Sequence, residues 1–243
     1  MLVLIKRGDY MGQQSSLTDV VIPPSDLHDN GRDYNDINTG ELVHGYICKI
    51  TVHCMGEAGQ LEPEECVESW NRSDREASSN YLIGPTGRVG LFIKEDDRAW
   101  TSNNRANDAH AITIEVASDA RDPYAMKDAA YQKLILLCAD ICTRYNFKLN
   151  YTGGPDGSLT GHFMFDTVAC PGQWFKNRYT EFVNAVNAKV AEGVFKPDEL
   201  DDSNKQREIE TQYDYYLITE TSKQNQPGEC GNKITASVYL GRW

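Results

Sequence analysis

Two residue types that bind zinc lie close together in the segment 160–172, which reads TGHFMFDTVACPG. Seven residues separate His162 from Cys170, enough for the loop between them to return both side chains to one point. Pro171-Gly172 follows the thiol directly and predicts a turn into the next helix. A catalytic zinc ion takes three nitrogen, sulfur or oxygen ligands and keeps one position open for water. Spacing alone leaves two interpretations open, a shared metal ion or unrelated packing.

A carboxylate in an apolar strand is the second chemical signal. Glu115 stands within ITIEV, where its side chain lies on the same strand face as Thr113. Burying a carboxylate without a partner is costly, so Glu115 either belongs to an edge strand whose polar face meets water or has a function. In the functional interpretation it is a general base whose pKa is raised by partial burial.

The elements that would position these residues follow from the periodicity of the apolar residues. Segment 46–54 (YICKITVHC) predicts a strand with Ile50 and Val52 on one face and Thr51 and His53 on the other. Further strands are predicted at 79–93, as a hairpin around Pro-Thr-Gly, and at 111–119; helices are predicted from Pro63, at 128–146 and at 173–193. Interleaved strands and helices predict an α/β (α+β) fold with a central mixed β-sheet flanked by helices.

Composition and charge exclude several classes of partner. The chain has 243 residues, 40% hydrophobic and 25% charged, as in a folded soluble protein. The net charge of −12 disfavours nucleic acid, and no run reaches the roughly 20 apolar residues of a membrane helix. Seven cysteines at irregular spacing argue against a disulfide framework, and Cys138 and Cys142, one helical turn apart, are expected to pack in the core.

The chain is expected to have four parts. Residues 1–45, rich in Asp, Asn, Gly and Pro, predict an irregular segment that wraps the catalytic domain, which is placed at 46–195. Residues 196–206 predict an acidic and polar linker, and 207–243 a small β appendage or part of a cell-wall-binding module. The first residues do not have the pattern of a secretory signal peptide.

Five ordered motifs resemble those of type 2 N-acetylmuramoyl-L-alanine amidases, the family that includes phage lysozyme-type amidases and peptidoglycan recognition proteins. The motifs are KITVHCMG, EASSNYLIGPTGRVGLFI, RAWTSNN, AITIEVASD and LTGHFMFDTVACPG. The resemblance covers roughly residues 45–190 and is strongest with clostridial and related Gram-positive members, many of them phage endolysins or autolysins. It implies the amidase/peptidoglycan-recognition fold.

Carried over by position, the resemblance implies roles for individual residues. His53, His162 and Cys170 would bind Zn²⁺, Glu115 would be the acid–base glutamate, and Tyr81 would contact the scissile amide. The implied substrate-binding residues are Asn80, Trp100 and Thr167. The sequence departs from the family pattern at Val168, where many members carry Lys or Thr that is thought to stabilise the oxyanion.

The resemblance also implies the reaction. A zinc-activated water would cleave the amide between the lactyl group of N-acetylmuramic acid and L-alanine of the stem peptide. A zinc peptidase acting within the stem peptide or cross-bridge, and a non-catalytic peptidoglycan-binding protein, are the alternatives. The expected site of action is the bacterial cell wall, reached by holin-assisted release of an endolysin or as a mature secreted fragment. Because wall polymers are anionic, a protein of charge −12 would need a dedicated wall-binding element, for which the C-terminal segment is a candidate.

Overall fold

A six-stranded sheet in the order β1-β6-β5-β7-β4-β8 organises the protein. The computed structural model describes residues 14–22, 31–72 and 77–195, so the linker and appendage predicted at 196–243 lie outside the described residues. The sheet consists of β1 Val20–Val21, β4 Lys49–Cys54, β5 Tyr81–Ile83, β6 Val89–Leu91, β7 Ala111–Val116 and β8 Leu159–Gly161. Only the β5–β6 pair is antiparallel in this sheet, which confirms the predicted hairpin and mixed sheet.

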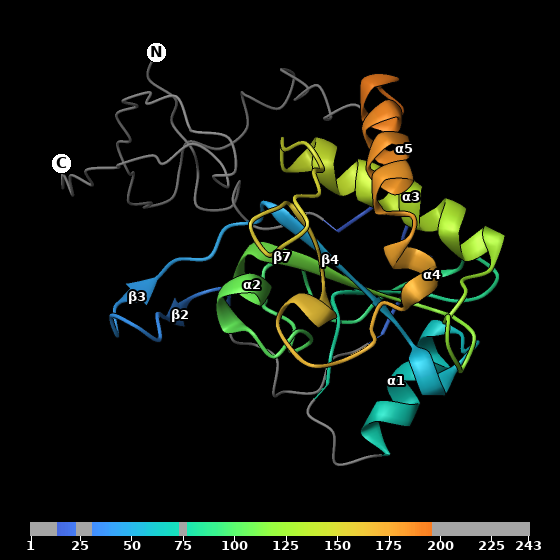
Figure 1. The fold of residues 1–243 in the computed structure, drawn as a ribbon, viewed down its shortest axis with the longest axis horizontal. Helices are drawn as coiled ribbons and strands as arrows, with labels where there is room; N and C mark the ends of the chain where they lie inside the picture. The colour runs from blue at the N-terminus through green and yellow to red at the C-terminus, as the bar shows by residue number, and fades with distance from the viewer. Residues whose placement is uncertain (1–13, 23–30, 73–76, 196–243) are drawn as a thin grey trace, which may run out of the picture.

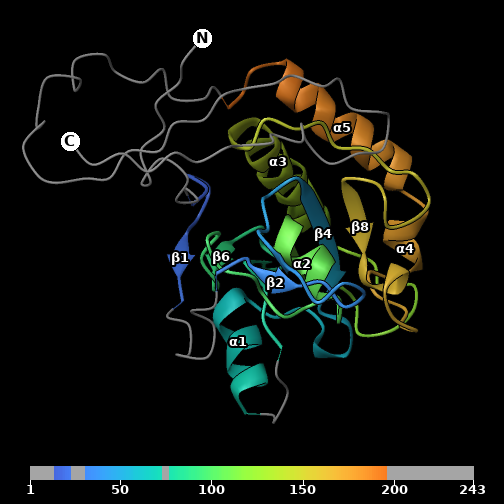
Figure 2. The same cartoon turned by 90° about the vertical axis from the view of Figure 1, so that its left-hand side faces the viewer.

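Helices cover both faces of the sheet (Figures 1 and 2). The helices are α1 Pro63–Asn71, α2 Arg105–His110, α3 Asp128–Arg144, α4 Gln173–Lys176 and α5 Tyr179–Ala191, with short 3-10 turns η3 Gly56–Ala58 and η4 His162–Met164. The larger core lies between the sheet and α3, α4 and α5, and a smaller core lies under α1. Among the described residues, no helix combines the length and apolarity needed to cross a membrane.

The predicted alternation along the central strands is confirmed. Ile50 and Val52 of β4 are fully buried in the larger core, whereas His53 points to the opposite face. Cys138 and Cys142 of α3 are buried in the same core, as expected. Both faces of β4 and β7 are therefore covered, and most polar side chains on these strands are buried.

Two expectations need correction. The single helix predicted at 173–193 is two helices, because Arg178 leaves helical geometry (φ −113°, ψ 3°) and its guanidinium stacks on the ring of Trp174, 4.0 Å from the centroid, while donating to the Trp174 carbonyl. The segment expected to be irregular contains short strands: β1 extends the sheet beside β6, and β2 Tyr34–Asn35 pairs with β3 Leu42–Val43.

Candidate active site

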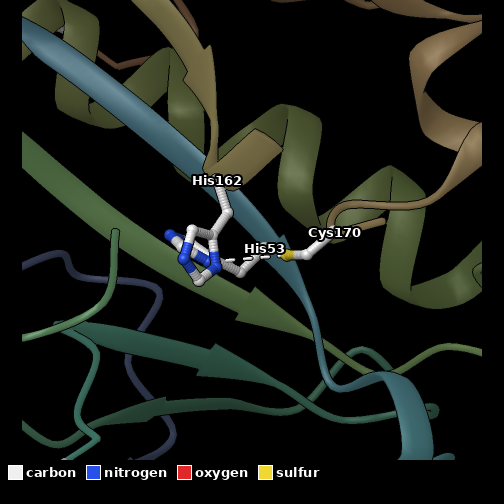
Figure 3. Close-up of side chains that lie close together, drawn as sticks. All are labelled: His53, His162 and Cys170. Carbon is white, nitrogen blue, oxygen red and sulfur yellow. Dashed lines mark hydrogen bonds between the residues drawn. The ribbon is translucent and has the colours of Figure 1, made fainter. Parts of the chain in front are cut away.

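The three predicted metal ligands converge at one edge of the sheet. β4 and β8 run parallel, so His53 near the end of β4 and His162 directly after β8 arrive at the same edge. Cys170 reaches the same point from the loop that precedes α4 (Figure 3). One ligand atom from each residue lies within 4.8 Å of the others. The His53 Nδ1 to Cys170 Sγ distance is 3.5 Å, and the two imidazole centroids are 5.1 Å apart.

The donor atoms of this cluster fit a zinc ion. The Nε2 atoms of His53 and His162 are buried and have no hydrogen-bond partner, an arrangement that costs free energy unless a ligand completes it. Burial, reinforced by His162, lowers the pKa of His53 to about 3, and burial also lowers the pKa of His162, so both rings are neutral and can offer a lone pair. Two imidazoles and one thiol are a zinc donor set, and the Cys54 amide donates to the Cys170 sulfur at 3.4 Å.

Glu115 lies beside this cluster. It is the register partner of His53 in the parallel β4–β7 pair, so both side chains emerge on the same face of the sheet. β7 is an inner strand, and the edge-strand alternative for Glu115 is therefore wrong. Its Oε2 atom is buried without a hydrogen-bond partner, and burial, with a smaller contribution from Cys54, raises the pKa of Glu115 well above its ordinary value. A carboxyl group in this position can exchange a proton with a ligand at the cluster.

Tyr81 does not reach the cluster, which corrects the expectation that it contacts the scissile amide. Tyr81 is the register partner of Ile114, so it points into the larger core on the opposite face from His53 and Glu115. Its hydroxyl donates to Glu95 at 2.5 Å and accepts from the Ser15 amide at 2.8 Å. The same Glu95 carboxylate accepts two hydrogen bonds from Arg144, each 2.7 Å long. Tyr81 is thus part of a buried polar network that joins the N-terminal segment to α3.

This position predicts a stability effect for Tyr81→Phe. The substitution leaves the buried Ser15 amide without an acceptor and removes one donor to Glu95, so we expect the free energy of unfolding to fall by about 1–3 kcal/mol. Any catalytic turnover by the folded protein should not change. Urea denaturation and steady-state kinetics measure the two quantities. A fall in turnover of about 100-fold at unchanged stability, the size expected for a lost oxyanion donor, would contradict this placement.

The three implied substrate-binding residues have different surroundings. Asn80 is fully buried, its amide nitrogen donates to three backbone carbonyls and its oxygen accepts from Thr113, so no donor or acceptor remains for a substrate. Trp100 is not among the described residues that line the groove beside the cluster, and its backbone forms a reciprocal pair with Ser78. Thr167 is exposed on the loop between His162 and Cys170, at the rim of the site.

The groove beside Cys170 is lined mostly by residues that sequence analysis did not identify. It has a volume of about 580 Å³ and is lined by Met55, Trp70 of α1 and Tyr124, together with Val168 and smaller residues. These side chains come from four separate segments, so no spacing motif marks them. Val168, which interrupts the family pattern, is 38% exposed and contributes an apolar surface to this groove.

Comparison with known proteins identifies a matching family and a similar fold. A family model described as N-acetylmuramoyl-L-alanine amidase matches residues 45–173. No match was found among curated proteins. The solved structure of Staphylococcus aureus hydrolase AmiA in complex with its ligand aligns with a TM-score of 0.52 at 13% identity, covering 74% of this chain and 92% of that one, and thus shows a similar fold.

Two further solved structures align with lower scores. N-acetylmuramoyl-L-alanine amidase LysC from Clostridium intestinale has a TM-score of 0.46 at 14% identity, covering 69% of this chain and 97% of that one. A mutant endolysin from Bacillus subtilis has a TM-score of 0.48 at 14% identity, covering 68% and 97%. The family match extends over more than half of the 243 residues and contains all three clustered ligands. The chain therefore belongs to the N-acetylmuramoyl-L-alanine amidase family.

Proposed function

We propose that the protein is a zinc-dependent peptidoglycan hydrolase that cleaves the amide between the lactyl group of N-acetylmuramic acid and L-alanine of the stem peptide. The observation that carries this proposal is the convergence of His53, His162 and Cys170 from three separate segments, with ligand atoms within 4.8 Å of one another. The family match supports the substrate class and the type of bond. We further propose that the protein acts at the bacterial wall as a phage endolysin or an autolysin.

The metal ligands and Glu115 would have different roles in hydrolysis of the amide. Zinc held by the two imidazoles and the thiol would polarise the amide carbonyl and lower the pKa of a nearby water. Glu115, on the strand next to His53, removes the proton from the attacking water and delivers it to the leaving nitrogen of L-alanine. The Oε2 atom of Glu115 is shielded from solvent and has no hydrogen-bond partner, which favours proton exchange with a substrate bound at the cluster.

The products of wall digestion test the bond assignment. We expect purified peptidoglycan treated with the enzyme to release stem peptides with a free L-alanine amino terminus and glycan with a free lactyl carboxylate, both detected by mass spectrometry. New termini within the stem peptide or the cross-bridge would instead identify a zinc peptidase. No new termini, with retained binding to the wall, would identify a non-catalytic binding protein. The Glu115→Gln variant is the matched control for non-enzymatic release.

The negative net charge of the chain bears on how the protein binds the bacterial wall. At a net charge of −12 the chain is repelled by the anionic polymers of Gram-positive walls at low salt. We propose that wall binding depends on a separate element, for which residues 207–243 are the candidate. Sedimentation with purified walls, before and after deletion of this segment, measures the contribution, and unchanged binding would count against it.

A further inference from the structure

A second cysteine lies beside the sulfur of the proposed metal ligand Cys170. Cys54 is the last residue of β4 and directly follows His53. Its backbone amide donates to the Cys170 sulfur at 3.4 Å, and the two thiols are close enough to form a hydrogen bond with each other. The cluster of possible metal ligands contains Cys170 but not Cys54. The Cys54 thiol is therefore a reactive group that has no part in the proposed hydrolysis.

Backbone hydrogen bonds fix the position of Cys170 relative to Cys54. The Cys170 carbonyl accepts from the Phe163 amide at 3.1 Å, and the Gly172 amide closes a turn by donating to the Ala169 carbonyl at 2.9 Å. Cys54 belongs to a strand that pairs with β7 on one side and with β8 on the other. Both sulfurs are therefore brought together by well-connected backbone. Such proximity in the folded chain is the first requirement for a disulfide.

The pair is open to small molecules, unlike the other free thiols. Cys54 and Cys170 both line the groove of about 580 Å³, where Cys54 is 8% exposed and Cys170 is half-buried. The remaining free cysteines of the described residues are at most 1% exposed: Cys66, Cys138 and Cys142. Oxidation of a cysteine requires access of the oxidant and thiolate character, and a sulfur that binds metal is a thiolate. A small oxidant such as hydrogen peroxide therefore reaches this pair before the buried thiols.

We infer that Cys54 is a resolving cysteine for Cys170, and that hydrogen peroxide joins the two residues in a disulfide that releases the metal. This inference rests on the proposed function, because it gives the ligand Cys170 a second, oxidised state. The thiolate, and not a disulfide sulfur, is the form of cysteine that binds zinc. Only His53 and His162 would remain as donors, so oxidation inactivates the site and reduction restores it.

The oxidation takes place in two steps, each of which releases water. The Cys170 thiolate attacks one oxygen of hydrogen peroxide, the O–O bond breaks, and the departing hydroxide takes a proton from solvent. The Cys54 sulfur then attacks the sulfenic acid formed on Cys170. The S–S bond forms, the S–O bond breaks, and the departing hydroxide takes the proton of the Cys54 thiol. Two electrons pass from the sulfurs to the peroxide, which is reduced to two molecules of water.

The presence of Cys54 decides whether this oxidation can be reversed. A sulfenic acid that meets no thiol is oxidised further to sulfinic and sulfonic acids, which dithiols do not reduce. A disulfide, in contrast, is reduced by thiol–disulfide exchange. Cys54 therefore protects the ligand sulfur from permanent loss, and its removal should make inactivation by peroxide irreversible.

Recovery of zinc after peroxide treatment tests the inference. The zinc-loaded full chain is treated with a small excess of hydrogen peroxide, the peroxide is removed with catalase, and released zinc is measured with a chromogenic chelator. We expect zinc release in proportion to a Cys54–Cys170 disulfide, which peptide mapping by mass spectrometry identifies. Dithiothreitol and added zinc should then restore the original zinc content. Cys54→Ala and Cys54→Ser should lose zinc without recovery, and their peptides should carry sulfinic or sulfonic acid at Cys170.

A thiol outside the groove provides the matched control. Cys142→Ala removes a thiol buried in α3 on the far side of the sheet, and this variant should release and regain zinc as the parent does. Before oxidation the Cys54 variants should contain as much zinc as the parent, because Cys54 is not among the clustered ligands. Loss of zinc from both reduced Cys54 variants would make Cys54 a ligand and overturn its assignment as the resolving cysteine.

The remaining outcomes separate this inference from the proposed function. Absence of the disulfide, or equal recovery of zinc by the parent and the Cys54 variants, would overturn the resolving role even if the reduced enzyme cleaves the lactyl amide. A chain that forms the disulfide reversibly, but that in its reduced state neither binds zinc nor cleaves the amide, would confirm the cysteine pair and contradict the proposed function.

Discussion

Cys170→Ala is expected to abolish zinc binding and wall hydrolysis together. Cys170 supplies the only sulfur among the three clustered ligands, and two imidazoles alone leave the ion with an incomplete donor set. Because loss of a group that merely supports a ligand already costs about 10- to 100-fold in metal affinity, loss of a ligand should cost more than about 100-fold. Zinc per chain after dialysis and the rate of wall clearing measure the two effects.

A second cysteine provides the matched control. Cys142 is a free thiol buried in α3, on the far side of the sheet from the cluster. Cys142→Ala removes a thiol of the same kind and should retain the zinc content and turnover of the parent. If Cys170→Ala kept its activity without metal, the assignment of the cluster as a catalytic zinc site would fail.

Glu115→Gln is expected to reduce turnover strongly while leaving zinc in place. The amide has nearly the shape of the carboxyl group but cannot accept a proton from water, and general acid–base catalysis contributes about 10²- to 10⁴-fold. We therefore expect the turnover number to fall by about this factor at an unchanged zinc content. A turnover number within a factor of about two of the parent would remove Glu115 from the chemical step, and loss of zinc would place it among the ligands.

The same substitution should stabilise the metal-free protein at neutral pH. Burial raises the folded-state pKa of Glu115, so folding favours its protonated form. This preference adds to the free energy of unfolding, and the contribution is fully present below the pKa of glutamate in the unfolded chain, about 4.3. It is lost as the pH rises through the higher pKa that Glu115 has in the folded protein. Glutamine does not titrate and avoids this loss. Thermal unfolding of zinc-free protein at pH 7 should show a higher Tm for Glu115→Gln than for the parent, and a lower Tm would contradict the cost assigned to the buried carboxylate.

The sequence predicted the parts of the site that depend on local patterns. Strict alternation in β4 and β7 placed His53 and Glu115 on the faces where the structure has them, because side-chain direction in a strand has a period of two residues. The amphipathic pattern of residues 128–146 correctly predicted a helix, α3, and the structure packs it on the opposite face of the sheet. Which strand lies at an edge could not be predicted, because the order of strands depends on contacts between distant segments.

The incorrect predictions have the same cause, because the local sequence does not contain information about contacts between distant segments. Tyr81 occupies a strand as predicted, but its face depends on its register with Ile114 of β7, which the local sequence does not contain. The motif implies that Asn80 binds substrate. In the structure its side-chain amide instead forms hydrogen bonds with backbone carbonyls of the segment 93–97 and with Thr113. Trp70 and Tyr124 come together only in the folded protein, since α1 and the connection after β7 are far apart in the sequence.

X-ray absorption at the zinc edge of the zinc-loaded protein tests the central claim most directly. The account predicts one zinc per chain, bound by one sulfur at about 2.3 Å and by two imidazole nitrogens at about 2.0–2.1 Å, with a lighter exchangeable ligand in the remaining position. A spectrum without sulfur, or a protein that binds no stoichiometric zinc, would contradict the assignment of His53, His162 and Cys170 as one metal site.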